Sequence, residues 1–246
     1  MKRIDCEQGT QEWLDARLGI PTASQFHRIL TPKTRKPSSQ AAGYRAELVA
    51  EWLLGESLDM VNTQYMERGS ELEGNAVRQF EWDHDCEVDR VGFCLTDDGR
   101  AGCSPDGLVG KYDGAEIKCF APAKHIAALL ADGPDNDHIC QIQGCMFVTG
   151  RMSWTRMYFH PSFPPVYHTL ERDDEFCIDL RVAIDCFLDR LDEDKKKLLA
   201  MGCKPIKPRP KVDPRDGSHS PDGGPSWDEA VAAQEAKEQF VMEASS

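Results

Sequence analysis

The sequence contains no long apolar segment. Hydrophobic residues make up 40% of its 246 residues, yet no run approaches the roughly 18 consecutive apolar residues that a membrane-spanning helix needs. The amino terminus turns acidic at Asp5 and Glu7 and has no apolar stretch of the kind found in signal peptides. We therefore expect a cytoplasmic protein that has no contact with a membrane.

Paired metal-ligating spacings are also missing. The ten cysteines include no Cys-x-x-Cys pair, and the two nearest in sequence are Cys140 and Cys145. Structural zinc sites usually place paired ligands about two to four residues apart. The seven histidines have no paired spacing either, and no serine or cysteine lies in the context of a catalytic triad. These absences argue against a zinc site, and the cysteines are expected to be small buried thiols.

The chain has little positive charge. Its formal net charge is −13, whereas proteins that bind nucleic acid indiscriminately present a basic surface. From Asp213 onward there are eight acidic and two basic residues, so part of the negative charge belongs to the tail. A DNA-binding protein of this charge must concentrate its cations around a groove. One cluster fits that need: Arg28, Lys33, Arg35, Lys36 and Arg45. A solvated loop is the alternative interpretation of this cluster.

Apolar spacing and turn residues divide the chain into helices and strands. Helices are predicted at residues 10–30 with a turn at 19–21, and at 44–54, 70 onward, 122–131, 136–148 and 174–199. Strands are predicted at residues 87–95, 107–111, 115–120, 152–160 and 166–171. Helices interleaved with strands indicate one α/β domain over residues 1–204. Residues 205–246 form an acidic segment rich in proline and glycine, which is expected to be a flexible tail.

The strongest chemical pattern lies at Glu116-Ile117-Lys118. Residues two apart on a strand share a face, so Glu116 and Lys118 point together while Ile117 points to the core. Asp106 lies in the turn-prone sequence Ser-Pro-Asp-Gly and arrives beside Glu116 if the two segments pair as a hairpin. A plain ion pair is the alternative interpretation of Glu116 and Lys118.

Two converging carboxylates and a lysine suit the hydrolysis of phosphodiesters. Mg²⁺ prefers hard oxygen ligands and keeps several waters, so one or two carboxylates and the substrate phosphate complete its shell. The metal acidifies a bound water and neutralises phosphoryl charge. A lysine can orient that water or stabilise developing negative charge. The pattern is therefore compatible with a metal-dependent nuclease, although an Asp followed at a variable distance by Glu-x-Lys also occurs by chance in many proteins.

Three further segments accompany this pattern in a fixed order. They are WLDARLGIPTAS at residues 13–24, RGSELE at 68–73 and QIQ at 141–143. With Asp106, Glu116 and Lys118, they resemble the bacteriophage lambda exonuclease family, also called YqaJ-like viral recombinases, within the PD-(D/E)XK nucleases. The resemblance runs from about residue 11 to residue 191. It implies a restriction-endonuclease-like PD-(D/E)XK core, in which a central mixed β-sheet is flanked by helices, and an exonuclease domain over residues 1–204.

The resemblance implies a role for each residue of the catalytic centre. Asp106 and Glu116 would be metal ligands, with the backbone carbonyl of Ile117 as a third. Lys118 would act on the attacking water. The expected metal is Mg²⁺, with Mn²⁺ as a possible substitute.

Two helical residues would join this centre. Glu73 would complete the metal or water shell, although Ser70-x-x-Glu73 also fits a capping box in which the glutamate binds the start of its own helix. Gln141 would position the water or the metal shell. Gln143 is a competing candidate for the same role.

The resemblance also implies a pocket for a terminal 5′-phosphate. Arg17 and Ser24 would form it, with Ser104 as a further donor, because arginine offers a fork of donors that matches phosphate. A surface ion pair is the alternative for Arg17. Trp13, one helical turn earlier, is expected to belong to the core. Met66 takes the place of an apolar residue that wedges between the last base pairs in this family.

The implied function is a magnesium-dependent 5′→3′ exonuclease on double-stranded DNA. It would leave 3′ single strands for phage-type homologous recombination by single-strand annealing, in the cytoplasm of a bacterial host. The family assembles as a ring-shaped homotrimer around DNA and commonly works with a single-strand annealing protein.

Two other functions stay open. A PD-(D/E)XK nuclease of the Cas4 or RecB type often carries an iron–sulfur cluster, but here Cys177, Cys186 and Cys203 lack the tight grouping that such a cluster needs. A non-catalytic DNA-end-binding recombination scaffold would be expected to have lost a carboxylate or the lysine, and none is missing.

Overall fold

The computed structural model describes residues 1–58, 63–131, 133 and 139–206, with the backbone alone for residues 63–71. The described residues belong to one unit, Met1–Pro208. The predicted flexible tail therefore lies outside the described residues, apart from its first two positions. The first residues of the helix predicted at 136–148 are outside them as well.

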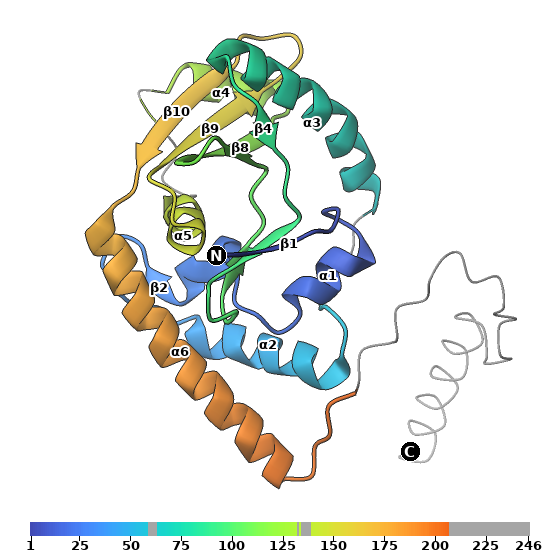
Figure 1. The fold of residues 1–246 in the computed structure, drawn as a ribbon, viewed down its shortest axis with the longest axis vertical. Coiled ribbons are helices and arrows are strands. Elements are labelled where there is room, and N and C mark those ends of the chain that lie inside the picture. Colours follow the sequence, from blue (N-terminus) through green and yellow to red (C-terminus); the bar gives the residue numbers. More distant parts are fainter. Residues whose placement is uncertain (59–62, 132, 134–138, 207–246) are drawn as a thin grey trace, which may run out of the picture. The chain divides into compact units, whose positions relative to one another are not determined.

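A five-stranded sheet forms the centre of the fold (Figure 1). Its strand order is β10-β9-β8-β7-β4, and neighbouring strands are antiparallel except for β8 and β9, which run parallel. The strands are β4 (Val88–Asp89), β7 (Gly107–Val109), β8 (Asp113–Cys119), β9 (Ser153–Phe159) and β10 (Val166–Glu171). The sheet is thus mixed, as predicted.

Two smaller sheets lie beside it. One contains β1 (Lys2–Ile4), β5 (Phe93–Leu95) and β6 (Gly102–Cys103), and the other pairs β2 (Leu30–Thr31) with β3 (Lys36–Pro37). The prediction of a single strand over residues 87–95 is wrong, because β4 and β5 belong to different sheets. Between them Gly92 passes so close to Cys6 that a Cβ at this position would lie 2.0 Å from the Cys6 carbonyl oxygen.

The helices mostly follow the sequence prediction. They are α1 (Gln11–Arg17), the 3₁₀ helix η1 (Ala23–Arg28), α2 (Ala41–Leu54), α3 (Thr63–His84), α4 (Pro122–Leu129), α5 (Ile139–Thr149) and α6 (Asp174–Ala200). The bounds of α2 and α6 confirm the predictions, and the predicted apolar stripe of α6 is buried. The start of α3 was predicted near residue 70, which is wrong, since the helix already begins at Thr63.

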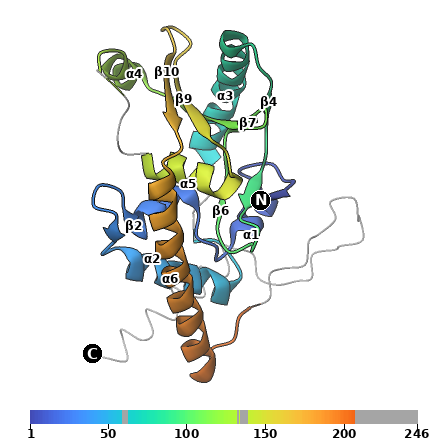
Figure 2. The same ribbon diagram turned by 60° about the vertical axis from the view of Figure 1, so that its left-hand side comes forward.

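Helices pack on both faces of the central sheet. On one face, Ala76 and Phe80 of α3 join Ile117 and Met157 in a buried apolar cluster. On the other, Trp154 belongs to a larger cluster that includes residues of η1, α2, α5 and α6. Helix α6 runs past both α5 and α2 (Figure 2). Because residues alternate along β8, Glu116 and Lys118 point to the face that carries α5, opposite to Ile117.

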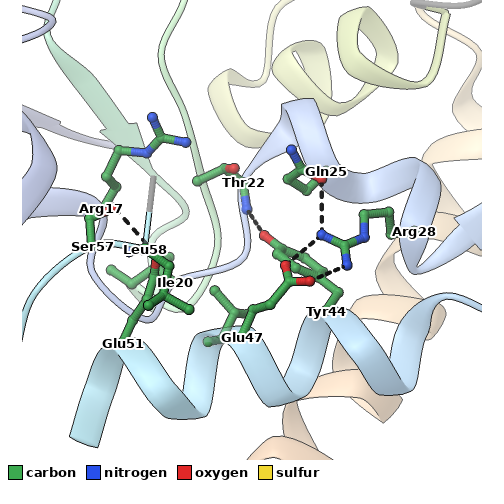
Figure 3. Close-up of a pocket in the computed structure, with 11 residues that line it drawn as sticks. Arg17, Ile20, Thr22, Gln25, Arg28, Tyr44, Glu47, Glu51, Ser57 and Leu58 are labelled. Carbon is green, nitrogen blue, oxygen red and sulfur yellow. Dashed lines mark hydrogen bonds and ion pairs between the residues drawn. The ribbon is translucent and has the colours of Figure 1, made fainter. Parts of the chain in front are cut away.

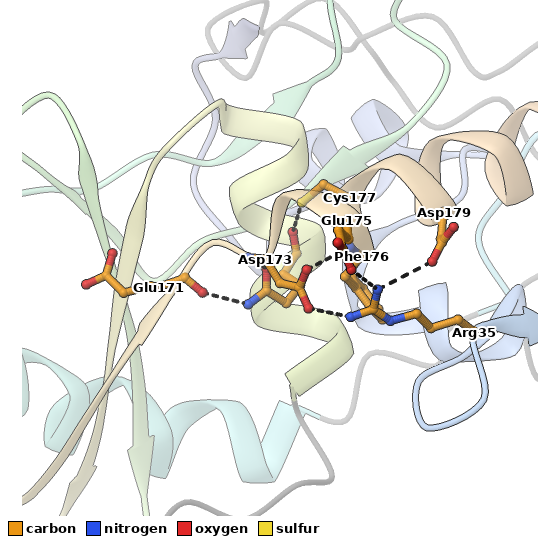
Figure 4. Close-up of polar contacts among 8 residues, drawn as sticks. Arg35, Glu171, Asp173, Glu175, Phe176, Cys177 and Asp179 are labelled. Carbon is orange, nitrogen blue, oxygen red and sulfur yellow. Dashed lines mark hydrogen bonds and ion pairs between the residues drawn. The ribbon is translucent and has the colours of Figure 1, made fainter.

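All three arginines of the predicted basic cluster form ion pairs within the fold. Arg35 lies 2.6 Å from Asp173 and 3.5 Å from Glu175, both at the start of α6 (Figure 4). Arg28 forms an ion pair with Glu47, and Arg45 forms one with Asp194. Their charge therefore holds the β2–β3 turn, η1 and α2 to neighbouring elements.

All ten cysteines lie in the described part of the chain and are free thiols. The prediction of buried thiols is confirmed for Cys94, Cys103, Cys140 and Cys145, and is wrong for the exposed Cys186. Over the same part of the chain, none of the helices combines the length and the apolar character that crossing a membrane requires.

Candidate active site

Most of the predicted site residues converge on one cleft of about 220 Å³. Its walls come from α1, η1, the β6–β7 connection, β8 and α5. Seven of the lining residues were predicted from the sequence: Arg17, Ser24, Ser104, Asp106, Glu116, Lys118 and Gln141. The remaining lining residues were not predicted to bind substrate or metal: Gln8, Trp13, Thr22, Ala23 and Cys145. Segments that are up to 137 positions apart in sequence, from Gln8 to Cys145, thus form a single site.

Glu116 and Lys118 form an ion pair on one face of β8. The side chain of Glu116 is 1% exposed, and its Oε1 lies 2.7 Å from the Nζ of Lys118. Burial alone would lower the pKa of Lys118, but the charges of Glu116 and Asp106 outweigh it and raise that pKa above its ordinary value. The lysine is therefore a cation at neutral pH.

Asp106 reaches Glu116 through the β7–β8 hairpin. Gly107 pairs with Ala115 in this hairpin, so the residues that come next, Asp106 and Glu116, lie opposite one another, as predicted. The backbone N–H of Ile117 donates a 2.6 Å hydrogen bond to Oδ2 of Asp106. Burial raises the pKa of Asp106 to about 7, and the negative charge of Glu116 contributes to the rise.

The arrangement fits a divalent cation. Oε2 of Glu116 is buried and has no hydrogen-bond partner within the described structure, which is costly for a carboxylate oxygen unless a cation balances it. No group of three or more histidine, cysteine, aspartate or glutamate side chains in the described residues is arranged to hold a metal. The carboxylates that line the cleft are those of Asp106 and Glu116. Two carboxylates suit Mg²⁺, because this ion completes its shell with waters and substrate oxygens.

The two glutamines of α5 have different surroundings. Nε2 of Gln141 donates to Oε1 of Glu116 at 3.0 Å, inside the cleft. Gln143 is buried, donates to the carbonyl oxygen of Glu171 and accepts a hydrogen bond from the backbone N–H of Asp173, both at 2.9 Å. Gln143 thus connects α5 to the start of α6 through hydrogen bonds. Of these two glutamines, Gln141 is the one that contacts a carboxylate of the cleft.

Glu73 lies beside the cleft without lining it. Helix α3 already runs through position 70, so Ser70 is not at a helix start and the capping-box interpretation is wrong. The carboxylate of Glu73 pairs with Arg90, and its charge contributes to the raised pKa of Asp106. The side chain of Met66 lies outside the described residues.

Hydroxyl and guanidinium groups also line the cleft. Oγ1 of Thr22 and Oγ of Ser24 lie 3.2 Å apart. The guanidinium of Arg17 lies over the ring of Trp13, 4.2 Å from its centroid, and Nε1 of Trp13 donates to Oγ of Ser104 at 2.8 Å. The prediction that Trp13 belongs to the core is wrong, since this side chain is half-buried and lines the cleft.

A second cleft of about 200 Å³ adjoins the first and shares Arg17 and Thr22 with it (Figure 3). It lies between η1 and α2, where the hydroxyl of Tyr44 accepts the backbone N–H of Thr22. This bond holds the turn that carries Thr22 and Ser24. Tyr44 gave no functional signal in the sequence because its spacing matches an ordinary apolar position of α2.

Comparisons with known proteins show which family and which solved structures this chain is similar to. A family model described as the YqaJ-like viral recombinase domain matches residues 12–152. Two crystal structures of LHK-Exo, an alkaline exonuclease from Laribacter hongkongensis, are similar to this chain, and one of them is a complex with dAMP. Each is 29% identical, has a TM-score of 0.69, and aligns over 78% of this chain and 98% of its own.

A phage-related exonuclease from Haemophilus somnus 129PT shares the fold, with a TM-score of 0.55, 14% identity, and coverage of 73% of this chain and 96% of its own. Among curated protein sequences, none is significantly similar. The structural neighbours are phage-type exonucleases with the PD-(D/E)XK core, so the predicted fold class is confirmed.

The structural role of Gln143 can be tested by measuring folding stability. We expect Gln143→Ala to lower the free energy of unfolding by about 2 kcal/mol, because it leaves the Glu171 carbonyl and the Asp173 N–H without their partner. The measurement is urea unfolding followed by circular dichroism. As a control, the exposed Gln11→Ala should stay within about 0.5 kcal/mol of the wild type. Equal stability of the two variants would contradict the structural role of Gln143.

Proposed function

The chain belongs to the YqaJ-like viral recombinase family, and on that basis we propose that it is a magnesium-dependent exonuclease that degrades one strand of duplex DNA from a 5′ end. Its kinship with alkaline exonucleases makes it a nuclease of phage-type recombination. The proposed product is a duplex with 3′ single-stranded ends, ready for single-strand annealing. The proposed setting is the cytoplasm of a bacterial host.

The observation that carries the proposal is the convergence of two chemically different groups of residues in one cleft. Asp106, Glu116 and Lys118 offer carboxylate oxygens and a cation, while Arg17 and Ser104 offer hydrogen-bond donors. Carboxylates suit a metal, and clustered donors suit a phosphate. A DNA strand with a 5′-terminal phosphate would use both, because its terminal phosphate and the first phosphodiester bond lie one nucleotide apart.

Mg²⁺ held by Asp106 and Glu116, with the Ile117 carbonyl as a further oxygen, would acidify water and neutralise phosphoryl charge. The residues of the chain supply the rest. Lys118 stays cationic, so it stabilises developing negative charge and orients water without accepting a proton. Gln141 fixes the carboxylate of Glu116 through its amide. Glu73 would join this shell if its carboxylate were released from Arg90.

The proposed 5′→3′ direction depends on the cleft residues that can donate hydrogen bonds to a phosphate. Arg17, Ser24 and Ser104 would bind a terminal 5′-phosphate and so set the scissile bond one nucleotide away, next to the carboxylates. LHK-Exo, 29% identical to this chain, crystallised with dAMP, a 5′-mononucleotide of the kind that such a reaction releases. Met66 would act as the wedge that separates the last base pairs.

The alternative functions receive less support. An iron–sulfur nuclease of the Cas4 or RecB type would need grouped cysteines, but Cys177, Cys186 and Cys203 are separate free thiols along and after α6. In a non-catalytic end-binding scaffold, nothing would compensate the free-energy cost of burying Oε2 of Glu116 without a hydrogen-bond partner. Such a protein would therefore not be expected to keep the carboxylate pair.

Digestion of linear duplex DNA labelled at either the 5′ or the 3′ end tests the proposal. We expect early release of the 5′ label as mononucleotide in Mg²⁺, none in EDTA, and partial activity in Mn²⁺. Lys118→Ala should slow the reaction by about a hundredfold or more, because it removes the cation beside the scissile phosphate. The exposed Lys111→Ala is the matched control and should keep wild-type activity. Unchanged digestion by Lys118→Ala, or early loss of the 3′ label, would refute the assignment.

We further propose that three copies form a ring around DNA and that a single-strand annealing protein is the partner. A ring would allow an acidic protein to retain DNA topologically, with its cations toward the channel. Light scattering should give a solution mass three times that of the 27.6 kDa chain. A monomeric mass at micromolar concentration would exclude the ring.

A further inference from the structure

Trp13 lies where the cleft residues of α1 meet those of the β6–β7 connection. It is on the same face of α1 as Arg17, one helical turn away, and is half-buried against the cleft. Its indole makes two contacts at once. The ring face carries the guanidinium of Arg17 at 4.2 Å, and Nε1 reaches Oγ of Ser104 at 2.8 Å, across 91 positions of sequence.

The hydrogen bond to Ser104 fixes the direction of its hydroxyl. An indole N–H is a donor only, so Oγ of Ser104 must be the acceptor. The hydroxyl proton of Ser104 is then directed away from Trp13, and the serine can donate it to an anion in the cleft. Gln8 holds the neighbouring backbone by donating to the carbonyl oxygens of Pro105 and Val91, at 2.8 and 2.9 Å. The main chain at Ser104 is therefore fixed as well.

The stacking on Arg17 acts in a similar way. Guanidinium N–H groups lie in the plane of the group, so contact through its face does not occupy them. A cation held over an indole face is also restricted in its torsions, which lowers the entropy lost when it binds an anion. The same ring thus orients the donors of Arg17 and of Ser104.

We propose that Trp13 is a positioning residue that aligns Arg17 and Ser104 on a terminal 5′-phosphate, so that it sets the preference for phosphorylated ends. This inference rests on the proposed exonuclease function. Tryptophan suits the position because it combines a broad ring face with a ring N–H that can only donate. Phenylalanine keeps an aromatic face and loses the donor, which separates the two contacts experimentally.

The kinetic test compares duplexes with 5′-phosphate and 5′-hydroxyl ends. For each protein, the ratio of kcat/KM on the two ends measures recognition of the phosphate. Trp13→Phe and Ser104→Ala should each lower this ratio by about tenfold, the effect of one hydrogen bond to a charged group. The double variant should be no worse than Ser104→Ala alone, since Trp13 acts through that hydroxyl. Trp82→Phe, which changes an 84% exposed tryptophan on α3, is the control and should keep the wild-type ratio.

Two kinetic outcomes would overturn the inference. If Trp13→Phe slowed both ends equally, Trp13 would be a structural residue without a part in phosphate recognition. If the losses in the double variant multiplied, Trp13 and Ser104 would act independently.

A spectroscopic test does not need catalysis. The indole N–H resonance of Trp13, identified by its loss in Trp13→Phe, should move in Ser104→Ala and on addition of dAMP to the wild type. An unchanged resonance in Ser104→Ala would refute the hydrogen bond in solution. Wild-type protein that digests no DNA, yet has the expected resonance shifts, would contradict the proposed exonuclease and leave the role of Trp13 in phosphate binding standing.

Discussion

Two carboxyl groups held side by side in one cleft are the constraint on which the site depends. Glu116 is almost fully buried. Asp106 is half-buried and lines the same cleft. Like charges so placed repel, and the pKa of Asp106 rises to about 7 through burial and through the charge of Glu116. The ion pair with Lys118 offsets part of this cost. A divalent cation would offset the rest, which is why we interpret the pair as a metal site.

The fold supports the pair from three sides. The β7–β8 hairpin sets Asp106 opposite Glu116, and the Ile117 N–H binds the Asp106 carboxylate. Behind the strand, the Ile117 side chain packs in the cluster that contains α3, which fixes the face of β8 that turns to the cleft. A slip of one residue would exchange Ile117 for Glu116 in that cluster. In front, Gln141 of α5 holds Glu116 by its amide. The register of β8 therefore determines both the packing of Ile117 in the core and the position of Glu116 in the cleft.

Local patterns in the sequence predicted the centre of the site better than its surroundings. The two-residue period of β8 and the turn at Asp106 suffice to bring Asp106, Glu116 and Lys118 together. Spacing could not separate Gln141 from Gln143, because the choice depends on where α6 begins. The hydrogen bonds of Trp13 and Tyr44 could not be predicted, since an aromatic residue at helical spacing looks like core until its polar atom is seen to have a partner. The interruption between β4 and β5 includes Gly92, which lies close to Cys6. This contact between residues far apart in sequence could not be predicted from local patterns.

The most direct test of the metal site is the pH dependence of folding stability, with and without Mg²⁺. A carboxyl whose pKa is raised by folding favours the folded state at low pH, and this contribution is lost as the pH rises through about 7. In EDTA, the free energy of unfolding should therefore fall between about pH 4, the ordinary pKa of an aspartate, and about pH 7, and Asp106→Asn should remove that component. Mg²⁺ should stabilise the wild type more at the higher pH and have little effect on Asp106→Asn. Identical pH profiles for the two proteins, or no response of the wild type to Mg²⁺, would contradict the account.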